Sequence, residues 1–177
     1  MARYVALLRG VNVGGIVITM ADLAAAFRAL GYSAVKTVLA SGNVAFDADA
    51  PDAELKPAIE AALVERFGYD ALVHVLTIEE LGRIVEAFPF DAEREGWHRY
   101  VIFLMGDAPT IDERRQSLLD LELDPAVERL AGGNGVLYWT VERGRTLSSV
   151  VGKESGRARY RSSTTTRNLR TLLKLLA

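Results

Sequence analysis

The organisation of the chain follows from one stretch near its start, Arg3-Tyr4-Val5-Ala6-Leu7-Leu8-Arg9-Gly10-Val11-Asn12-Val13-Gly14-Gly15. Residues 4–9 are short, mostly apolar and followed by a glycine, which predicts a buried β-strand. A glycine-rich turn with one asparagine comes next. A second stretch, Arg99-Tyr100-Val101-Ile102-Phe103-Leu104-Met105-Gly106, agrees with residues 3–10 at five of eight positions. This agreement favours an internal duplication of the chain.

The elements predicted around the first copy have the order βαββαβ. Helix caps, apolar spacing and glycines set their limits. They are a strand at 4–9, a helix from Thr19 to Gly31, strands at 35–40 and 43–46 around the turn Ser41-Gly42, a helix at 55–67 whose first turn is left undefined by Pro57, and a strand at 71–76. This order is typical of the split βαβ, or ferredoxin-like, unit.

The second half repeats most of this order after a connecting helix. Its expected elements are the connecting helix at 77–88, a strand at 99–106, a helix at 110–121, strands at 127–130 and 136–141 around a turn at 132–135, and a last helix at 165–176. We therefore expect an α+β fold of two ferredoxin-like subdomains from an internal duplication, with antiparallel sheets and helices on one face. The subdomains would span residues 1–76 and 77–177, the second ending in a basic helix.

Composition narrows the class of protein. Of the 177 residues, 50% are hydrophobic and 25% are charged, which is typical of a globular chain. There is no cysteine, and His74 and His98 are the only histidines, so a metal site or a histidine-based triad has few residues to use. No apolar stretch reaches the roughly 18 residues of a membrane span. We expect a soluble, cytoplasmic protein that needs no metal or cofactor.

Charge is distributed unevenly along the chain. Residues 143–177 hold nine Lys or Arg and one acid, Glu154, a net charge of +8 that leaves residues 1–142 at −10 of the total of −2. Such a segment indicates either an anionic partner or a tail folded back onto its own acidic body. Nucleic acid is one such partner, although the pI of about 5.8 is far below that of a dedicated nucleic-acid-binding domain.

A first candidate site follows from the predicted topology. The end of the first strand should lie beside the turn at 41–43, with backbone N–H groups of the nearby glycines exposed. Guanidinium and N–H donors together suit a phosphate or carboxylate. The residues concerned are Arg9, Asn12, Gly14, Gly15, Ser41 and Asn43. The second copy has Met105 in place of Arg9, so the strand itself does not require an arginine.

The same residues have a purely structural interpretation. The glycines can simply allow a turn with positive φ, and both asparagines can hydrogen-bond their own backbone. The motif is also not a phosphate-binding P-loop, because the Gly-Lys-Ser/Thr ending is missing.

A second candidate lies in the basic segment. A run of Ser and Thr at 162–166 is predicted to open the last helix, where it would supply a cap and free N–H groups for an anion. Arg167 would share one helical stripe with Arg170 and Lys174. The candidate binding residues here are Lys153, Thr166, Arg167 and Asn168.

Several of these motifs resemble one bacterial family, called domain of unknown function 1697. The similar residues are Leu7 to Leu8 with the following Arg9-Gly10-Val11-Asn12-Val13-Gly14-Gly15, then Met20, Leu23, Leu30, Gly31, Ser41-Gly42-Asn43-Val44, Phe46, Thr166-Arg167-Asn168, Thr171, Lys174 and Leu175. The resemblance runs nearly end to end. It implies a small cytoplasmic protein with two ferredoxin-like halves and no established activity. One departure is Leu169, where the family often has tryptophan.

Three classes of function remain open. We expect first the binding of a phosphorylated or otherwise anionic ligand, nucleotide and nucleic acid included, between the loop at 9–15, the turn at 41–43 and the basic C-terminal segment. The alternatives are a metal-independent enzyme acting on a phosphoester, which would lack an evident general base, and an interaction or scaffold protein. Ligand identity and oligomeric state do not follow from the sequence.

Overall fold

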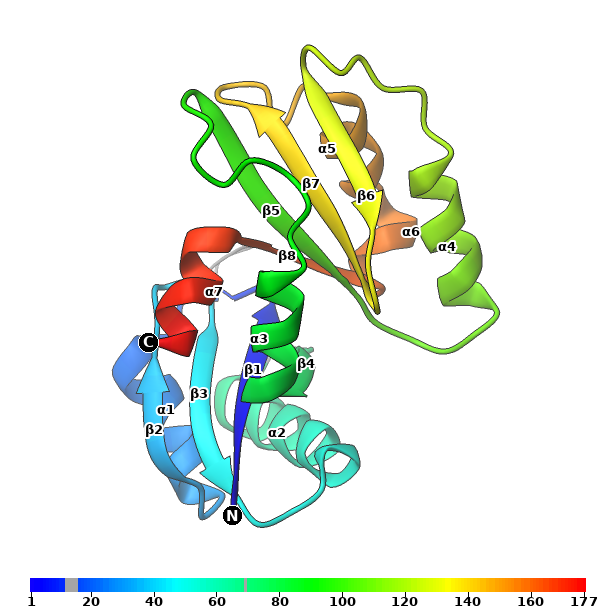
Figure 1. The fold of residues 1–177 in the computed structure, drawn as a ribbon. Coiled ribbons are helices and arrows are strands. Elements are labelled where there is room, and N and C mark those ends of the chain that lie inside the picture. The colour runs from blue at the N-terminus through cyan, green and yellow to red at the C-terminus, as the bar shows by residue number, and fades with distance from the viewer. Residues whose placement is uncertain (12–15, 69) are drawn as a thin grey trace. The chain divides into compact units, whose positions relative to one another are not determined.

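A computed structural model describes residues 1–11, 16–68 and 70–177. The chain forms two compact units, residues 1–83 with 173–177 and residues 84–172. Each unit contains one four-stranded antiparallel sheet with its helices (Figure 1). The predicted α+β fold of two ferredoxin-like halves is confirmed. No helix in the described ranges is long and apolar enough to cross a membrane.

The first unit has the predicted βαββαβ order. Its elements are β1 (Ala2–Arg9), α1 (Met20–Ala29), β2 (Ser33–Thr37), β3 (Asn43–Ala48), α2 (Asp52–Phe67) and β4 (Leu72–Thr77), and α3 (Ile78–Glu86) follows. The strands lie in the order β2-β3-β1-β4. Helix α2 starts at Asp52, so Pro57 lies inside it instead of in its first turn.

The second unit repeats this architecture in full. Its elements are β5 (Trp97–Leu104), α4 (Thr110–Leu119), β6 (Glu128–Gly132), β7 (Val136–Glu142), α5 (Val150–Ser155), α6 (Ala158–Arg161) and β8 (Thr164–Asn168), and α7 (Leu169–Leu176) follows. The strand order β6-β7-β5-β8 matches that of the first sheet, strand for strand.

The predicted last helix from residue 165 is wrong at its start. Thr164–Asn168 is strand β8, which pairs antiparallel with β5, and α7 begins only at Leu169. Three consecutive threonines favour this strand because their β-branched side chains suit extended backbone. The second half therefore has the fourth strand that the sequence pattern did not reveal.

Registers in the two sheets support the duplication. Tyr4 lies opposite Phe46 with 5.9 Å between ring centroids, and Tyr100 lies opposite Trp139 with 5.1 Å. The backbone N–H of Leu8 donates to the Gly42 carbonyl at 2.8 Å. At the corresponding place, the N–H of Leu104 donates to the Gly135 carbonyl at 3.1 Å.

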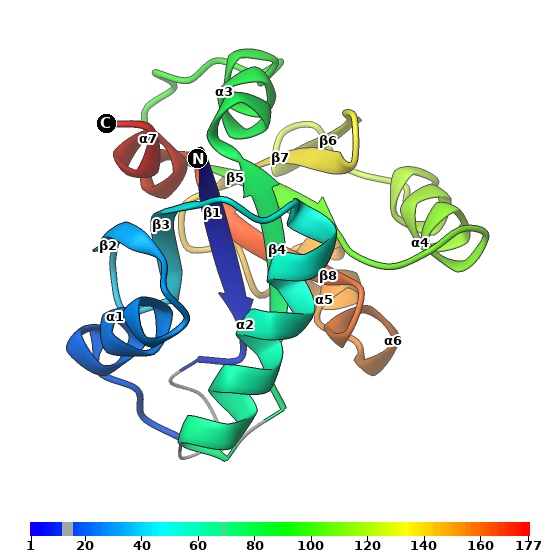
Figure 2. The ribbon, with the colours of Figure 1, turned by 90° about the horizontal axis from the view of Figure 1, so that it is seen from below.

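Each sheet packs one face against its own helices. In the first unit, α1 and α2 lie on the same side of the strands (Figure 2), where Phe27 and Ile59 join Tyr4 and Leu8 in one buried cluster. In the second unit a corresponding cluster joins α4, α5 and α6 to the sheet. Its buried members are Ile102, Leu118, Leu137, Trp139, Val141, Val151 and Tyr160. The ends of the strands are thereby held in fixed register.

Candidate functional site

The first candidate lies where β1 ends beside the β2–β3 turn. Leu7 pairs with Asn43 of β3 on one side and with His74 of β4 on the other. Directly paired side chains share a face, and residues two apart on a strand do as well. Arg9, Asn43 and His74 therefore belong to one face, the one opposite α1 and α2. The expectation that the end of the first strand lies beside this turn is confirmed.

The turn itself is longer than the predicted pair Ser41-Gly42. Thr37 pairs with Val44, and the Val38 N–H donates to the Asn43 carbonyl at 2.8 Å, so residues 39–42 form the turn. In the β6–β7 hairpin, the Gly133 N–H donates to the Val136 carbonyl at 2.9 Å, so only residues 134 and 135 form the turn. The first turn is therefore two residues longer than its counterpart.

Two residues of this turn have left-handed backbone. Leu39 has φ of 60° and Gly42 has φ of 80°. A Cβ at Gly42 would stand 2.9 Å from the Cβ of Leu8, closer than real side chains approach. Glycine is needed at position 42 for both reasons, because the turn lies directly against β1.

Asn43 holds the turn from inside. Its side chain is fully buried, and Nδ2 donates to the Val38 carbonyl at 2.7 Å and to the Ser41 hydroxyl at 2.9 Å. Ser41 is exposed beside it. The Asn43 amide thus shapes the turn, and direct contact of Asn43 with a ligand stays a prediction. The predicted site residues Asn12, Gly14 and Gly15 lie outside the described residues.

Comparison of the two halves singles out the same place. When the two sheets are aligned by their registers, Arg9 corresponds to Met105. Arg9 lies opposite Leu72 of the first half, and Met105 lies opposite Ser163 of the second. By the same comparison, Val136 stands where the first half has Asn43, and Thr165 stands where it has His74. At each of these three positions the first half has a hydrogen-bonding side chain that is larger than the side chain of its counterpart in the second half. His74 was not among the predicted site residues because only the register places it next to Arg9.

Residues 166–168 of the second candidate lie in strand β8 and not at the start of a helix. Thr166 pairs with Ile102 and Arg167 pairs with Val101 in the sheet, so their side chains point to opposite faces. Arg167 is 8% exposed and donates to the Thr165 hydroxyl at 2.8 Å. The Asn168 side chain accepts the Arg170 N–H at 2.9 Å, at the start of α7. The predicted stripe of Arg167 with Arg170 and Lys174 is wrong, since Arg167 precedes the helix.

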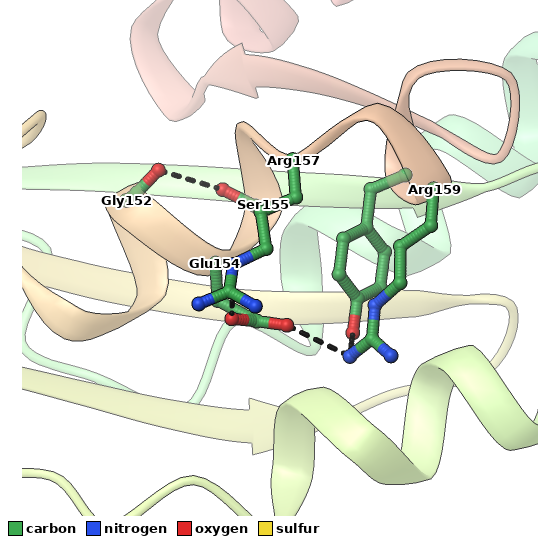
Figure 3. A network of polar contacts seen from close by, with 6 residues as sticks. Gly152, Glu154, Ser155, Arg157 and Arg159 are labelled. Atoms are coloured by element: carbon green, nitrogen blue, oxygen red, sulfur yellow. Dashed lines mark hydrogen bonds and ion pairs between the residues drawn. The ribbon is translucent and has the colours of Figure 1, made fainter.

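Lys153 is exposed on α5, within the basic segment 143–177. Beside it, Glu154 accepts from Nε of Arg157 at 3.0 Å and from an Nη of Arg159 at 2.7 Å (Figure 3). The Arg159 guanidinium also donates to the Tyr160 hydroxyl at 2.7 Å. These arginines are thus held by an acid of their own segment.

The sequence-based hypothesis joined Lys153, Thr166, Arg167 and Asn168 with the first candidate in one site. The residues of the two candidates belong to different units, and their joint contribution stays a prediction. Within the described ranges, no three His, Asp or Glu side chains gather as a potential metal site.

The fold and the strand registers together define a class of protein: an α+β protein of two ferredoxin-like halves that differ, among other places, at the end of their first strands. The family model described as "Protein of unknown function (DUF1697)" matches residues 1–138, so the chain belongs to this family and the resemblance in the sequence is confirmed. The structure of conserved bacterial protein SP0830 from Streptococcus pneumoniae is similar, with a TM-score of 0.83 and 25% identity over 98% of this chain and 96% of that one. No curated protein matches the sequence.

Proposed function

We propose that the first unit binds a phosphorylated or otherwise anionic small molecule at the end of β1, beside the turn of residues 39–42. One observation carries this proposal: a difference in charge and a difference in turn length between the duplicated halves lie together at this place. The first half has Arg9 where the second has Met105, and its turn is two residues longer. A duplicated scaffold does not need these differences to fold, and a ligand site accounts for their common location.

The residue types suit an anion. A guanidinium offers planar paired donors that match the oxygens of phosphate or carboxylate. Gly10 is exposed and left-handed, with φ of 78°, and a glycine in this conformation lets backbone N–H groups approach a ligand closely. Ser41 adds an exposed hydroxyl, and His74 lies on the same sheet face as Arg9. The ligand class that fits is a phosphate monoester, such as a nucleotide or sugar phosphate.

A thermal-shift screen tests this proposal. The probes are inorganic phosphate, AMP and glucose 6-phosphate, with chloride at equal ionic strength as the reference. At about 100 times its Kd a ligand adds ~2.7 kcal/mol to the unfolding free energy. For a chain of this length that shift raises Tm by roughly 5–10 °C.

Variants of Arg9 test whether the ligand-induced rise in Tm comes from the site at the end of β1. Arg9→Ala should remove the ligand-induced shift, and Arg9→Lys should keep only part of it because the paired donor geometry is lost. Arg28→Ala is the matched control, since Arg28 is exposed on α1 of the same unit. The proposal fails if no probe stabilises the wild type, or if Arg9→Ala responds as the wild type does.

A further inference from the structure

The second unit contains a cavity of about 400 Å³ at the end of β5. It lies between the start of α4 and the β6–β7 turn, and its volume is within the range of small-molecule sites. The residues that line it are Leu104, Gly106, Ile111, Asp112, Arg115, Gly133, Asn134 and Gly135. None of the residues proposed to bind an anion in the first unit takes part in it.

Arg115 occupies a defined place in this cavity. It is half-buried, and one Nη donates to the Gly133 carbonyl at 3.2 Å. A Cβ at Gly132 would stand only 2.5 Å from that Nη, so the glycine leaves room for the guanidinium. The backbone of Gly132 is outside the left-handed region, which means that its φ does not require glycine. Its lack of a side chain matters for the position of Arg115.

Asp112 brings the opposite charge to the same cavity. It lies three residues before Arg115 on α4, a spacing that puts both side chains on one side of the helix. Among the described residues neither side chain forms an ion pair. Leu104 and Ile111 add apolar wall beside the two charges. The cavity therefore offers a cationic and an anionic group that do not neutralise each other.

We propose that this cavity binds a small zwitterion of the free amino acid class. The ligand carboxylate would accept from Arg115 and from the Asn134 amide, and its ammonium group would donate to Asp112. Such a ligand satisfies both charges at once, whereas a phosphate dianion would be repelled by Asp112. The aliphatic wall of Leu104 and Ile111 favours an apolar ligand side chain. This site is independent of the proposed function of the first unit.

The test is a titration followed by amide chemical shifts of the ¹⁵N-labelled full chain. Glycine, L-alanine and L-leucine are the zwitterionic probes, and acetate and methylammonium each carry only one of the two charges. We expect the zwitterions to shift the amides of Ile111, Gly133 and Gly135, with L-leucine binding most tightly. Acetate and methylammonium should bind at least about tenfold more weakly, because each leaves one charge unpaired.

Three variants decide whether the two charges act together. Arg115→Ala and Asp112→Asn should each weaken L-leucine binding by roughly tenfold or more, as loss of a charged hydrogen bond does. Gly132→Ala keeps both charges and moves only the end of the flexible Arg115 side chain, so it should weaken binding less than Arg115→Ala does. Asp112→Asn decides the matter if Arg115→Ala does not fold. The exposed control Arg129→Ala should bind as the wild type does. Equal binding of acetate and L-leucine, no shift with any zwitterion, or unchanged binding by Asp112→Asn would overturn the proposal.

Discussion

Glu128 is a buried carboxylate that ties the second sheet to α5. It is 1% exposed, and its oxygens accept the indole N–H of Trp139 at 3.1 Å and the backbone N–H of Val150 at 2.7 Å. Both donors would lose their acceptor if the carboxylate were removed. We predict that Glu128→Ala lowers the unfolding free energy by roughly 2–4 kcal/mol, measured by urea denaturation.

The control variants separate this effect from a loss of charge. Glu128→Gln should cost less than Glu128→Ala, because the amide oxygen still accepts from part of the N–H groups of Trp139, Val150 and Val151. Glu122→Ala, at an exposed position, should change stability by less than about 0.5 kcal/mol. Similar small losses for all three variants would show that the buried hydrogen bonds contribute little.

His98 should make stability depend on pH. Burial lowers the pKa of His98 below its usual value of 6.5, and the nearby charges of Arg143 and Arg99 lower it further. The unfolded chain therefore binds this proton more readily than the folded chain does. Stability is full above the unfolded pKa and falls as the pH drops through 6.5 toward the folded pKa.

The prediction for His98→Gln is a flatter pH profile. Urea midpoints of wild type and variant, measured between about pH 7.5 and about pH 5.5, bracket the ordinary histidine pKa. The wild type should lose more stability over this interval than the variant does. Parallel profiles for the two proteins would contradict the account of this residue.

At the scale of elements, the β2–β3 turn carries local strain. Leu39 is half exposed and has φ of 60°, a region that costs a non-glycine residue about 1 kcal/mol. Leu39→Gly should therefore raise the unfolding free energy by up to about 1 kcal/mol, measured by urea denaturation. Ala40→Gly, whose φ is not positive, is the control and should destabilise. A loss of stability in Leu39→Gly would mean that the leucine side chain stabilises more than its backbone costs.

Helix starts and the core strands could be predicted because their signals are local. Thr19 caps α1 by accepting the Asp22 N–H at 3.0 Å, and Thr77 caps α3 by accepting the Glu80 N–H at 3.1 Å. Both threonines are followed by an acid three residues on, which is a recognisable pattern. The strand at the start of each half was evident from its apolar run and its repetition.

Strand β8 and helices α5 and α6 could not be predicted in the same way. The Thr164–Asn168 segment lacks an apolar alternation, and its partner β5 lies more than fifty residues earlier in the chain. A run of Ser and Thr before an amphipathic stretch also resembles a helix cap. Its strand character depends on long-range pairing, which overrides the local signal.

For the candidate site at the end of β1, the sequence predicts which segments meet but not the detailed positions of their side chains. The sequence places Arg9 and Ser41 near each other once the topology is assumed. The complete burial of Asn43 and the position of His74 beside Leu7 depend on the register between three strands. The length of the turn depends on the same pairing. None of these features has a signal within a short window of sequence.

At the scale of the whole molecule, charge argues against nucleic acid as the main partner. The chain has a net charge of −2, and two arginines of the basic segment are paired with Glu154. We predict that a fluorescent single-stranded oligonucleotide binds more weakly than about 10 μM at physiological salt, measured by anisotropy. Submicromolar binding that is lost in Arg161→Glu and kept in Arg28→Glu would contradict this prediction.

The most direct test of the account is a titration of the ¹⁵N-labelled chain with AMP. The differences between the halves predict that the anion binds in the first unit only. The amides of Gly10, Val11, Ser41 and Gly42 should shift with a common Kd, and the same titration of Arg9→Ala should leave them unchanged. The counterparts in the second half, Gly106, Asn134 and Gly135, should stay in place. No shift in the first set, or equal shifts in both sets, would contradict the proposal that the first half carries a distinct anion site.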